Sequence, residues 1–258
     1  MEYEHSLYGD WQRETVSHTA RSLWYRQKTG NQLEALSPAI TRFFLIDLPN
    51  HGASLWTSEI SYEEFSSHLS NFIVEQGLTD PIILGHSLGG KVAMFLALEN
   101  PHLVGRLIIV DIAPVNYDGE DQLKVVNALS GLDIEQIKTR SEADNLLSDD
   151  IADPLLRGFL LQNLVRDGDH YNWRCNLKGL KNGMNNIVEF PKMGKKVVFD
   201  SPTLFIKGSK SGYILPIHQK HIVSFFPSNS LIEIEGAGHW PHVDGKDKVI
   251  ESIINFLA

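Results

Sequence analysis

Residues 85–89 read Gly-His-Ser-Leu-Gly and match the pattern G-x-S-x-G. In this pattern a strand turns sharply into a helix and lifts the serine hydroxyl above the sheet edge, where it can attack an acyl carbon. The two glycines remove side chains that would collide in the strained turn. The amide of Leu88, at the start of the helix, would face the negative oxygen that develops during the attack. The segment therefore predicts that Ser87 is a nucleophile.

The same glycines allow two other interpretations. Residues 85–91 also spell G-x-x-x-x-G-K, a phosphate-binding pattern, but Val92 stands where a Ser or Thr would hold magnesium. A glycine-rich turn from strand to helix with no chemistry is the other alternative. The apolar run before residue 85 and the helical pattern after Ser87 favour the nucleophile.

A serine hydroxyl needs a base that removes its proton and an acid that orients this base. The chain has eleven histidines, and His239 lies on the loop "GAGHWPH", between the last predicted strand and the last predicted helix. In the chain order Ser, acid, His, this is the position of the base. His242 is the second candidate. We expect His51 to pack in a turn and His86 to pack beside the nucleophile.

Asp111 is the predicted acid. It ends the run "RLIIVD", at the carboxyl edge of the predicted sheet, where the catalytic groups of parallel sheets gather. The loop "SKSGYILP", after a later strand, has no Asp or Glu. Asp200 precedes its strand, and Asp244 lies at the start of a helix, where an acid suits the helix dipole. Capping of the next segment is the alternative role of Asp111.

Short apolar runs separated by helical patterns must position these residues, as in βαβ units. Strands are predicted at 42–47, 81–85, 106–111, 202–208 and 230–236. The first four runs are almost continuously apolar, which indicates parallel strands covered on both faces. Helices are predicted at 61–77, with a capping-box spacing at Ser61 and a stop at Gly77, at 87–101 and at 246–258. The last helix has one apolar face, formed by Val249, Ile250, Ile253, Ile254 and Leu257.

Residues 115–196 are helical in pattern, polar and free of convincing strands. We interpret them as a helical lid inserted into a single domain that spans residues 1–258. Five apolar residues of the lid are candidates to line an acyl pocket: Phe159, Leu160, Leu161, Leu164 and Trp173. Packing of the lid onto the sheet is the alternative role of these side chains.

The composition excludes several classes of function. The chain has 258 residues, enough for one sizeable core, and 23 Lys and Arg against 32 Asp and Glu, so its net charge is −9. Without a basic run, a nucleic-acid partner is not expected. Cys175 is the single cysteine, which excludes an intrachain disulfide and a cysteine-rich metal site and fits a reducing compartment. With no membrane-spanning run and no evident targeting segment, we expect a cytoplasmic protein that needs no cofactor or metal and has no membrane partner.

Together, the motifs resemble those of the α/β-hydrolase superfamily, and specifically of the YbfF-type esterases and their mitochondrial animal relatives. The resemblance covers about residue 31 to the C-terminus and rests on "IDLPNHGAS", "GHSLGGKVAM", "RLIIVDIAPV", "FLLQNLV" with "WRCNL", and "GAGHWPH", in this order. It implies an α/β-hydrolase fold, a mostly parallel sheet with helices on both faces, and esterase or thioesterase activity on small to medium acyl esters. It also supports Ser87, Asp111 and His239 as a triad.

One part of this family's pattern is absent. These enzymes have a further central strand, ending in His-Gly, and a loop that supplies the second oxyanion amide. Here the segments 22–30 and 31–40, which resemble the strand before it and the helix after it, abut at Gly30 and Asn31. About fifteen residues are missing at this junction.

The sheet must then close a gap or recruit residues from the first thirty. One oxyanion donor is worth on the order of 3 kcal/mol of barrier, so a triad that relies on Leu88 alone would be slow. The alternative function is therefore a catalytically impaired hydrolase fold that acts as a binding module.

Overall fold

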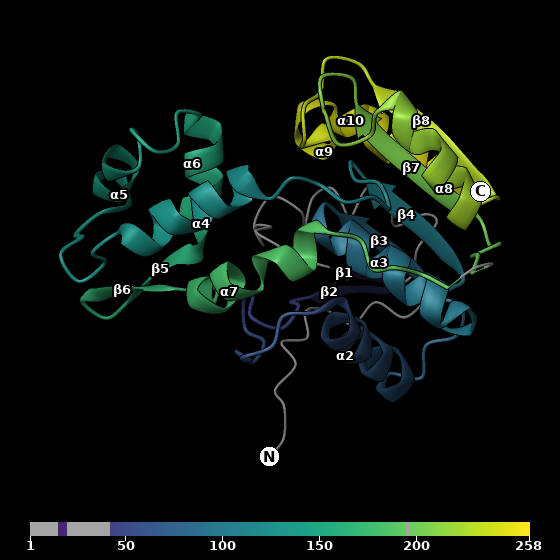
Figure 1. The fold of residues 1–258 in the computed structure, drawn as a ribbon, viewed down its shortest axis with the longest axis horizontal. Helices are drawn as coiled ribbons and strands as arrows, with labels where there is room; N and C mark the ends of the chain where they lie inside the picture. Colours follow the sequence, from purple (N-terminus) through teal and green to yellow (C-terminus); the bar gives the residue numbers. More distant parts are fainter. Residues whose placement is uncertain (1–14, 20–41, 195–196) are drawn as a thin grey trace.

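A parallel sheet forms the centre of the fold (Figure 1). The computed structural model describes residues 15–19, 42–194 and 197–258. Six strands lie in the order β2 (Arg42–Ile46), β1 (Thr15–Thr19), β3 (Ile82–His86), β4 (Arg106–Val110), β7 (Thr203–Gly208) and β8 (Asn229–Ile234), and all neighbouring pairs are parallel. The five predicted strands are confirmed, with ends within two residues of the prediction.

The strand β1 lies inside the sheet, second in the order of the described strands, and fills the gap that the sequence left open. It pairs with β2 on one side and with β3, the strand that leads to Ser87, on the other. The sheet therefore recruits residues from the first thirty instead of closing a gap. The predicted strand at 22–30, the predicted helix at 31–40 and the junction at Gly30 and Asn31 lie outside the described residues.

Helices cover both faces of the sheet, because side chains of its apolar strands alternate between the faces. On one face, Leu107, Ile109 and Phe205 pack with residues of α2 (Tyr62–Glu75), α3 (Leu88–Glu99) and α8 (Gln219–Phe225). On the other face, Ile108, Val110, Leu204 and Ile206 pack with α10 (Lys246–Leu257). The predicted apolar side of the last helix is confirmed, since Val249 and Ile253 are buried there.

The start of α2 is the one that the sequence predicts. Ser61 Oγ accepts a hydrogen bond from the amide of Glu64 at 3.2 Å, and this bond satisfies one of the free amides of the first turn. Gly77 follows the helix with a φ of +61°, a conformation that favours glycine. Among the described residues, no helix combines the length and the apolar character that crossing a membrane requires.

The segment 115–196, of which residues 115–194 are described, contains four α-helices, a short 3-10 helix and a β-hairpin. The helices are α4 (Glu120–Gly131), α5 (Arg140–Leu146), α6 (Pro154–Leu160) and α7 (Leu177–Val188), and the hairpin pairs β5 (Leu164–Asp167) with β6 (His170–Trp173). Figure 1 shows α4, α5 and α6 to one side of the sheet, away from α8, α9 (Pro241–Asp244) and α10. Short 3-10 helices span Pro101–Leu103, Leu161–Asn163 and Pro216–His218.

The prediction that this segment lacks strands was wrong. Each hairpin strand has only four residues, and β6 is polar apart from Tyr171 and Trp173, so neither gives an apolar run. Gly168, with a φ of +59°, makes the turn between them. Its left-handed conformation is one that glycine adopts without steric cost.

Candidate active site

Ser87 sits in a strained turn between β3 and α3. Its backbone has a φ of 52° and a ψ of −125°, a region that residues with a side chain rarely adopt. A Cβ on Gly85 would lie 2.4 Å from the carbonyl oxygen of Gly89, and a Cβ on Gly90 would lie 2.6 Å from Ile112. Glycine is therefore required on both sides of the serine, and the predicted strand, turn and helix are present. The G-x-S-x-G pattern itself does not include Gly90.

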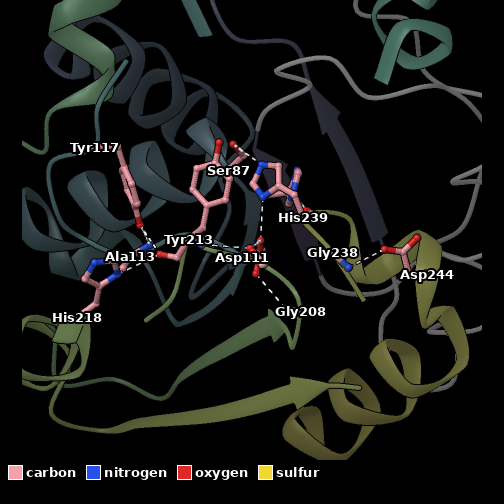
Figure 2. A network of polar contacts seen from close by, with 12 residues as sticks. Ser87, Asp111, Ala113, Tyr117, Gly208, Tyr213, His218, Gly238, His239 and Asp244 are labelled. Carbon is pink, nitrogen blue, oxygen red and sulfur yellow. Dashed lines mark hydrogen bonds and ion pairs between the residues drawn. The ribbon is translucent and has the colours of Figure 1, made fainter. Parts of the chain in front are cut away.

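The fold brings the three predicted triad residues together (Figure 2). His239 Nε2 lies 3.2 Å from Ser87 Oγ, and His239 Nδ1 lies 2.8 Å from Asp111 Oδ2. A neutral imidazole that donates its Nδ1 proton to the carboxylate presents Nε2 as an acceptor for the serine proton. The arrangement can therefore pass a proton from the hydroxyl to the imidazole.

Asp111 is completely buried at the end of β4, with a φ of 52°. Its Oδ1 accepts a hydrogen bond from the amide of Gly208 at 2.9 Å, and its Oδ2 accepts one from the hydroxyl of Ser211. These donors compensate for the loss of water around the buried carboxylate. The end of β7 and the loop after it, which has no acid of its own, thus supply the donors that hold the acid that follows β4. Sequence reasoning missed Ser211, because a lone serine in a loop carries no motif.

Two hydrogen bonds to backbone atoms hold the loop that carries His239. His86 Nε2 donates to the carbonyl of His239 at 2.7 Å, and the amide of Gly238 donates to Asp244 at 2.8 Å. Asp244 therefore fixes this loop. It is the last residue of α9 and not the first of the last helix, since α10 begins at Lys246, so the expected role at a helix start was wrong. The ring of Tyr213 stacks on the ring of His239, with 4.0 Å between centroids.

The other candidate histidines lie in packing positions. Burial and the neighbouring imidazoles lower the pKa of His86 well below its usual value, so it stays neutral beside the nucleophile. Burial also lowers the pKa of His242, whose ring lies 5.1 Å from that of His86. His51 is buried in a turn, where its Nδ1 lies 3.0 Å from the carbonyl oxygen of Pro49. Asp200 accepts from Ser228 Oγ before the start of β7, at the opposite edge of the sheet from Ser87.

Leu88 stays the predicted oxyanion donor, because of its place at the start of α3. Leu88 is the first residue of α3, and the first amides of a helix have no acceptor within the helix. It also lies at the positive end of the helix dipole. The expected site of a second donor, around Gly30 and Asn31, lies outside the described residues.

Lys91, the lysine of the phosphate-binding pattern, does not face an open loop. It is 2% exposed, its Nζ donates to the carbonyl of Val188 at 2.6 Å, and it lies 4.8 Å from the ring centre of Tyr117. Burial lowers the pKa of Lys91 to about 7, against a smaller opposing effect of Glu189. A lysine engaged in this way cannot bind a phosphate, which disfavours the interpretation of residues 85–91 as a phosphate-binding loop.

We expect the free energy of unfolding to rise by about 1 kcal/mol between pH 7.5 and 8.5 on account of Lys91. In this range the unfolded chain still binds the lysine proton and the native protein does not, so a rising pH favours the native protein. As the pH falls towards 7, the native protein also binds the proton, and this dependence of the unfolding free energy on pH fades. Urea unfolding at both pH values measures the rise. Lys91→Met should remove it, whereas Lys181→Met, which changes an exposed lysine of α7, should keep it. An equal rise in Lys91→Met would contradict the assignment.

The apolar candidates of the insertion divide into two groups. Leu160, Leu161 and Leu164 are buried in one apolar cluster, and Trp173 is half-buried against it. Their contacts favour the packing role. Phe159 is half-buried against the same cluster, and in addition its ring lies 5.6 Å from the ring of Trp240, the residue after His239. Phe159 is thus the candidate that reaches the triad loop.

Comparisons with known proteins show which family the chain resembles. A family model described as the alpha/beta hydrolase fold matches residues 16–246. The sn-1-specific diacylglycerol lipase ABHD11 of Mus musculus is 35% identical over 222 residues, which cover 84% of this chain and 72% of the relative. Esterase YbfF of Escherichia coli (strain K12) is 29% identical over 212 residues, which cover 82% and 81%. The solved structure of a marine microorganism esterase superposes with a TM-score of 0.89, at 32% identity and 95% coverage of both chains.

Proposed function

Because this chain belongs to the α/β-hydrolase family and is a carboxylic ester hydrolase like its relatives named esterase and lipase, we propose that it cleaves small to medium acyl esters or thioesters through an acyl-enzyme at Ser87. One observation carries the proposal. Ser87 Oγ, the two ring nitrogens of His239 and the carboxylate of Asp111 lie in one line of hydrogen bonds.

The proposed reaction has two halves. In the first, His239 Nε2 takes the proton of Ser87 as the serine oxygen attacks the acyl carbon, and Asp111 stabilises the imidazolium that forms. The amide of Leu88 donates to the oxyanion of the tetrahedral intermediate. His239 then gives its proton to the leaving alcohol or thiol, and the acyl group stays on Ser87. In the second half, His239 activates water in the same way, and the carboxylic acid leaves.

Apolar side chains beside the triad support an acyl substrate, the class that the family resemblance implies. We assign Phe159 and Trp240 to the wall of an acyl pocket, because their rings contact each other next to His239. The buried leucines of the insertion hold this wall in place. The segment 115–196 would then act as a lid over the acyl group. The cytoplasmic location stays a prediction from composition.

A fluorophosphonate probe tests the proposal directly. We expect one covalent adduct at Ser87, located by mass spectrometry, and a loss of p-nitrophenyl butyrate hydrolysis in proportion to the labelled fraction. The probe reacts only with a serine whose proton has a base and whose developing charge has a donor. Ser87→Ala should give no adduct. A folded protein that stays unlabelled and inactive would instead support the catalytically impaired alternative.

A further inference from the structure

Tyr213 lies against the face of the imidazole of His239 (Figure 2). The ring centroids are 4.0 Å apart and the ring planes differ by 25°, so the two rings are stacked. The mechanism proposed above gives this residue no role. The stacking therefore calls for its own explanation.

Hydrogen bonds hold Tyr213 at its backbone and at its hydroxyl. Its amide donates to Ser211 Oγ at 3.2 Å, and its carbonyl accepts from the hydroxyl of Tyr117 at 2.6 Å. The hydroxyl of Tyr213 accepts from Gln122 Nε2 at 2.9 Å. Because Ser211 also donates to Asp111, the position of the phenol ring is tied to the acid. Because Gln122 belongs to α4, the ring is also tied to the insertion.

We propose that Tyr213 is a positioning residue that keeps the imidazole of His239 in line with Ser87 and Asp111 and favours its charged form during acyl transfer. The proposal rests on the proposed function. A rotation of the imidazole out of the plane that it shares with its two partners would drive it into the fixed phenol ring. An aromatic face also attracts a cation, and the imidazole gains a positive charge as it takes the serine proton.

The other rings around His239 do not oppose this charge. The ring of His86 lies 4.6 Å away, and its lowered pKa keeps it neutral. The ring of Trp240 lies 5.8 Å away and carries no charge. The carboxylate of Asp111 is the charged group in contact with the imidazole among the described residues, and it is of opposite sign.

Two substitutions distinguish the effect of the Tyr213 ring from the effect of its hydroxyl. Tyr213→Leu removes the aromatic face and keeps an apolar side chain, whereas Tyr213→Phe keeps the ring and removes the hydroxyl. For p-nitrophenyl butyrate we expect kcat to fall about tenfold in Tyr213→Leu, with KM within about twofold of wild type. We expect Tyr213→Phe to keep kcat within about threefold, because it retains the stacked face.

Proton NMR gives a second readout that does not depend on turnover. The ring current of a stacked phenol moves the Cε1 proton of His239 upfield. We expect this shift in the wild type and in Tyr213→Phe, and its loss in Tyr213→Leu. If Ser87→Ala kept the esterase activity, the proposed function would fail, while the NMR shift would still report the stacking.

Four results would overturn the proposal. They are a wild-type kcat in Tyr213→Leu, equal losses of kcat in both variants, a loss confined to KM, and no upfield shift in the wild type. Thermal unfolding of each variant checks that it is folded. If Tyr213→Leu does not fold, Tyr213→Met takes its place with the same expectations.

Discussion

Ser87→Ala is expected to lower kcat for ester hydrolysis by about a millionfold. Without the hydroxyl no acyl-enzyme forms, and His239 and Asp111 have no proton to move, so the loss equals that of the whole triad. The alanine itself fits the turn, because Gly85 and Gly90 provide the space. Hydrolysis of p-nitrophenyl butyrate by purified protein measures the loss.

The matched control is Ser224→Ala, which changes an exposed serine of α8 whose hydroxyl bonds to the carbonyl of His221. It should keep the wild-type rate. Active-site titration with a fluorophosphonate excludes a trace of wild-type enzyme as the source of any residual activity. Hydrolysis by Ser87→Ala at more than a hundredth of the wild-type rate would refute the assignment of the nucleophile, on the order-of-magnitude scale of triad losses.

Asp111→Asn is expected to lower kcat by about ten thousandfold with little change in volume. The amide nitrogen of the new side chain can donate to His239 Nδ1, which favours the tautomer with its proton on Nε2. Nε2 then cannot accept the proton of Ser87. The carboxylate also accepts hydrogen bonds from the amide of Gly208 at Oδ1 and from the hydroxyl of Ser211 at Oδ2. An asparagine has one acceptor oxygen, so it cannot accept both bonds on separate atoms.

Asp244→Asn is the control for this substitution. Asp244 also bonds to the loop of His239, but at the amide of Gly238 and not at the imidazole. We expect its kcat to stay within about tenfold of wild type, because it contacts no ring nitrogen. Comparable losses in both variants would assign Asp111 a structural role, and the alternative of simple capping would then return.

Short-range signals predicted the frame of the site. The apolar runs gave the strands, and the order of strand, Ser87 and helix gave the turn. His239 followed from its place between the last strand and the last helix. Asp111 needed one more step, the rule that functional groups gather at the carboxyl edge of a parallel sheet. Each of these inferences depends on residues close together in sequence or on one topological rule.

Long-range contacts account for what the sequence did not predict. The segment "TVSHT" of β1 has no apolar run, and two distant neighbours, β2 and β3, define it as a strand. Ser211 acts through Asp111, which lies 100 residues earlier in the chain. Tyr213 acts through a ring stack with His239. Lys91 matched a local pattern, but only the fold shows that its amino group is buried against the carbonyl of Val188.

Because Asp111 follows β4, the charge of the acid and the hydrogen-bond donors that hold it come from different parts of the chain. The negative charge comes from Asp111 after β4, whereas Gly208 at the end of β7 and Ser211 in the turn that follows contribute only neutral hydrogen-bond donors. Substitutions in that turn can therefore change the hydrogen bonds to the carboxylate while the charge itself is preserved. For directed evolution, residues 209–215 offer positions where the contacts of Asp111 and His239 can be changed without replacing a triad residue.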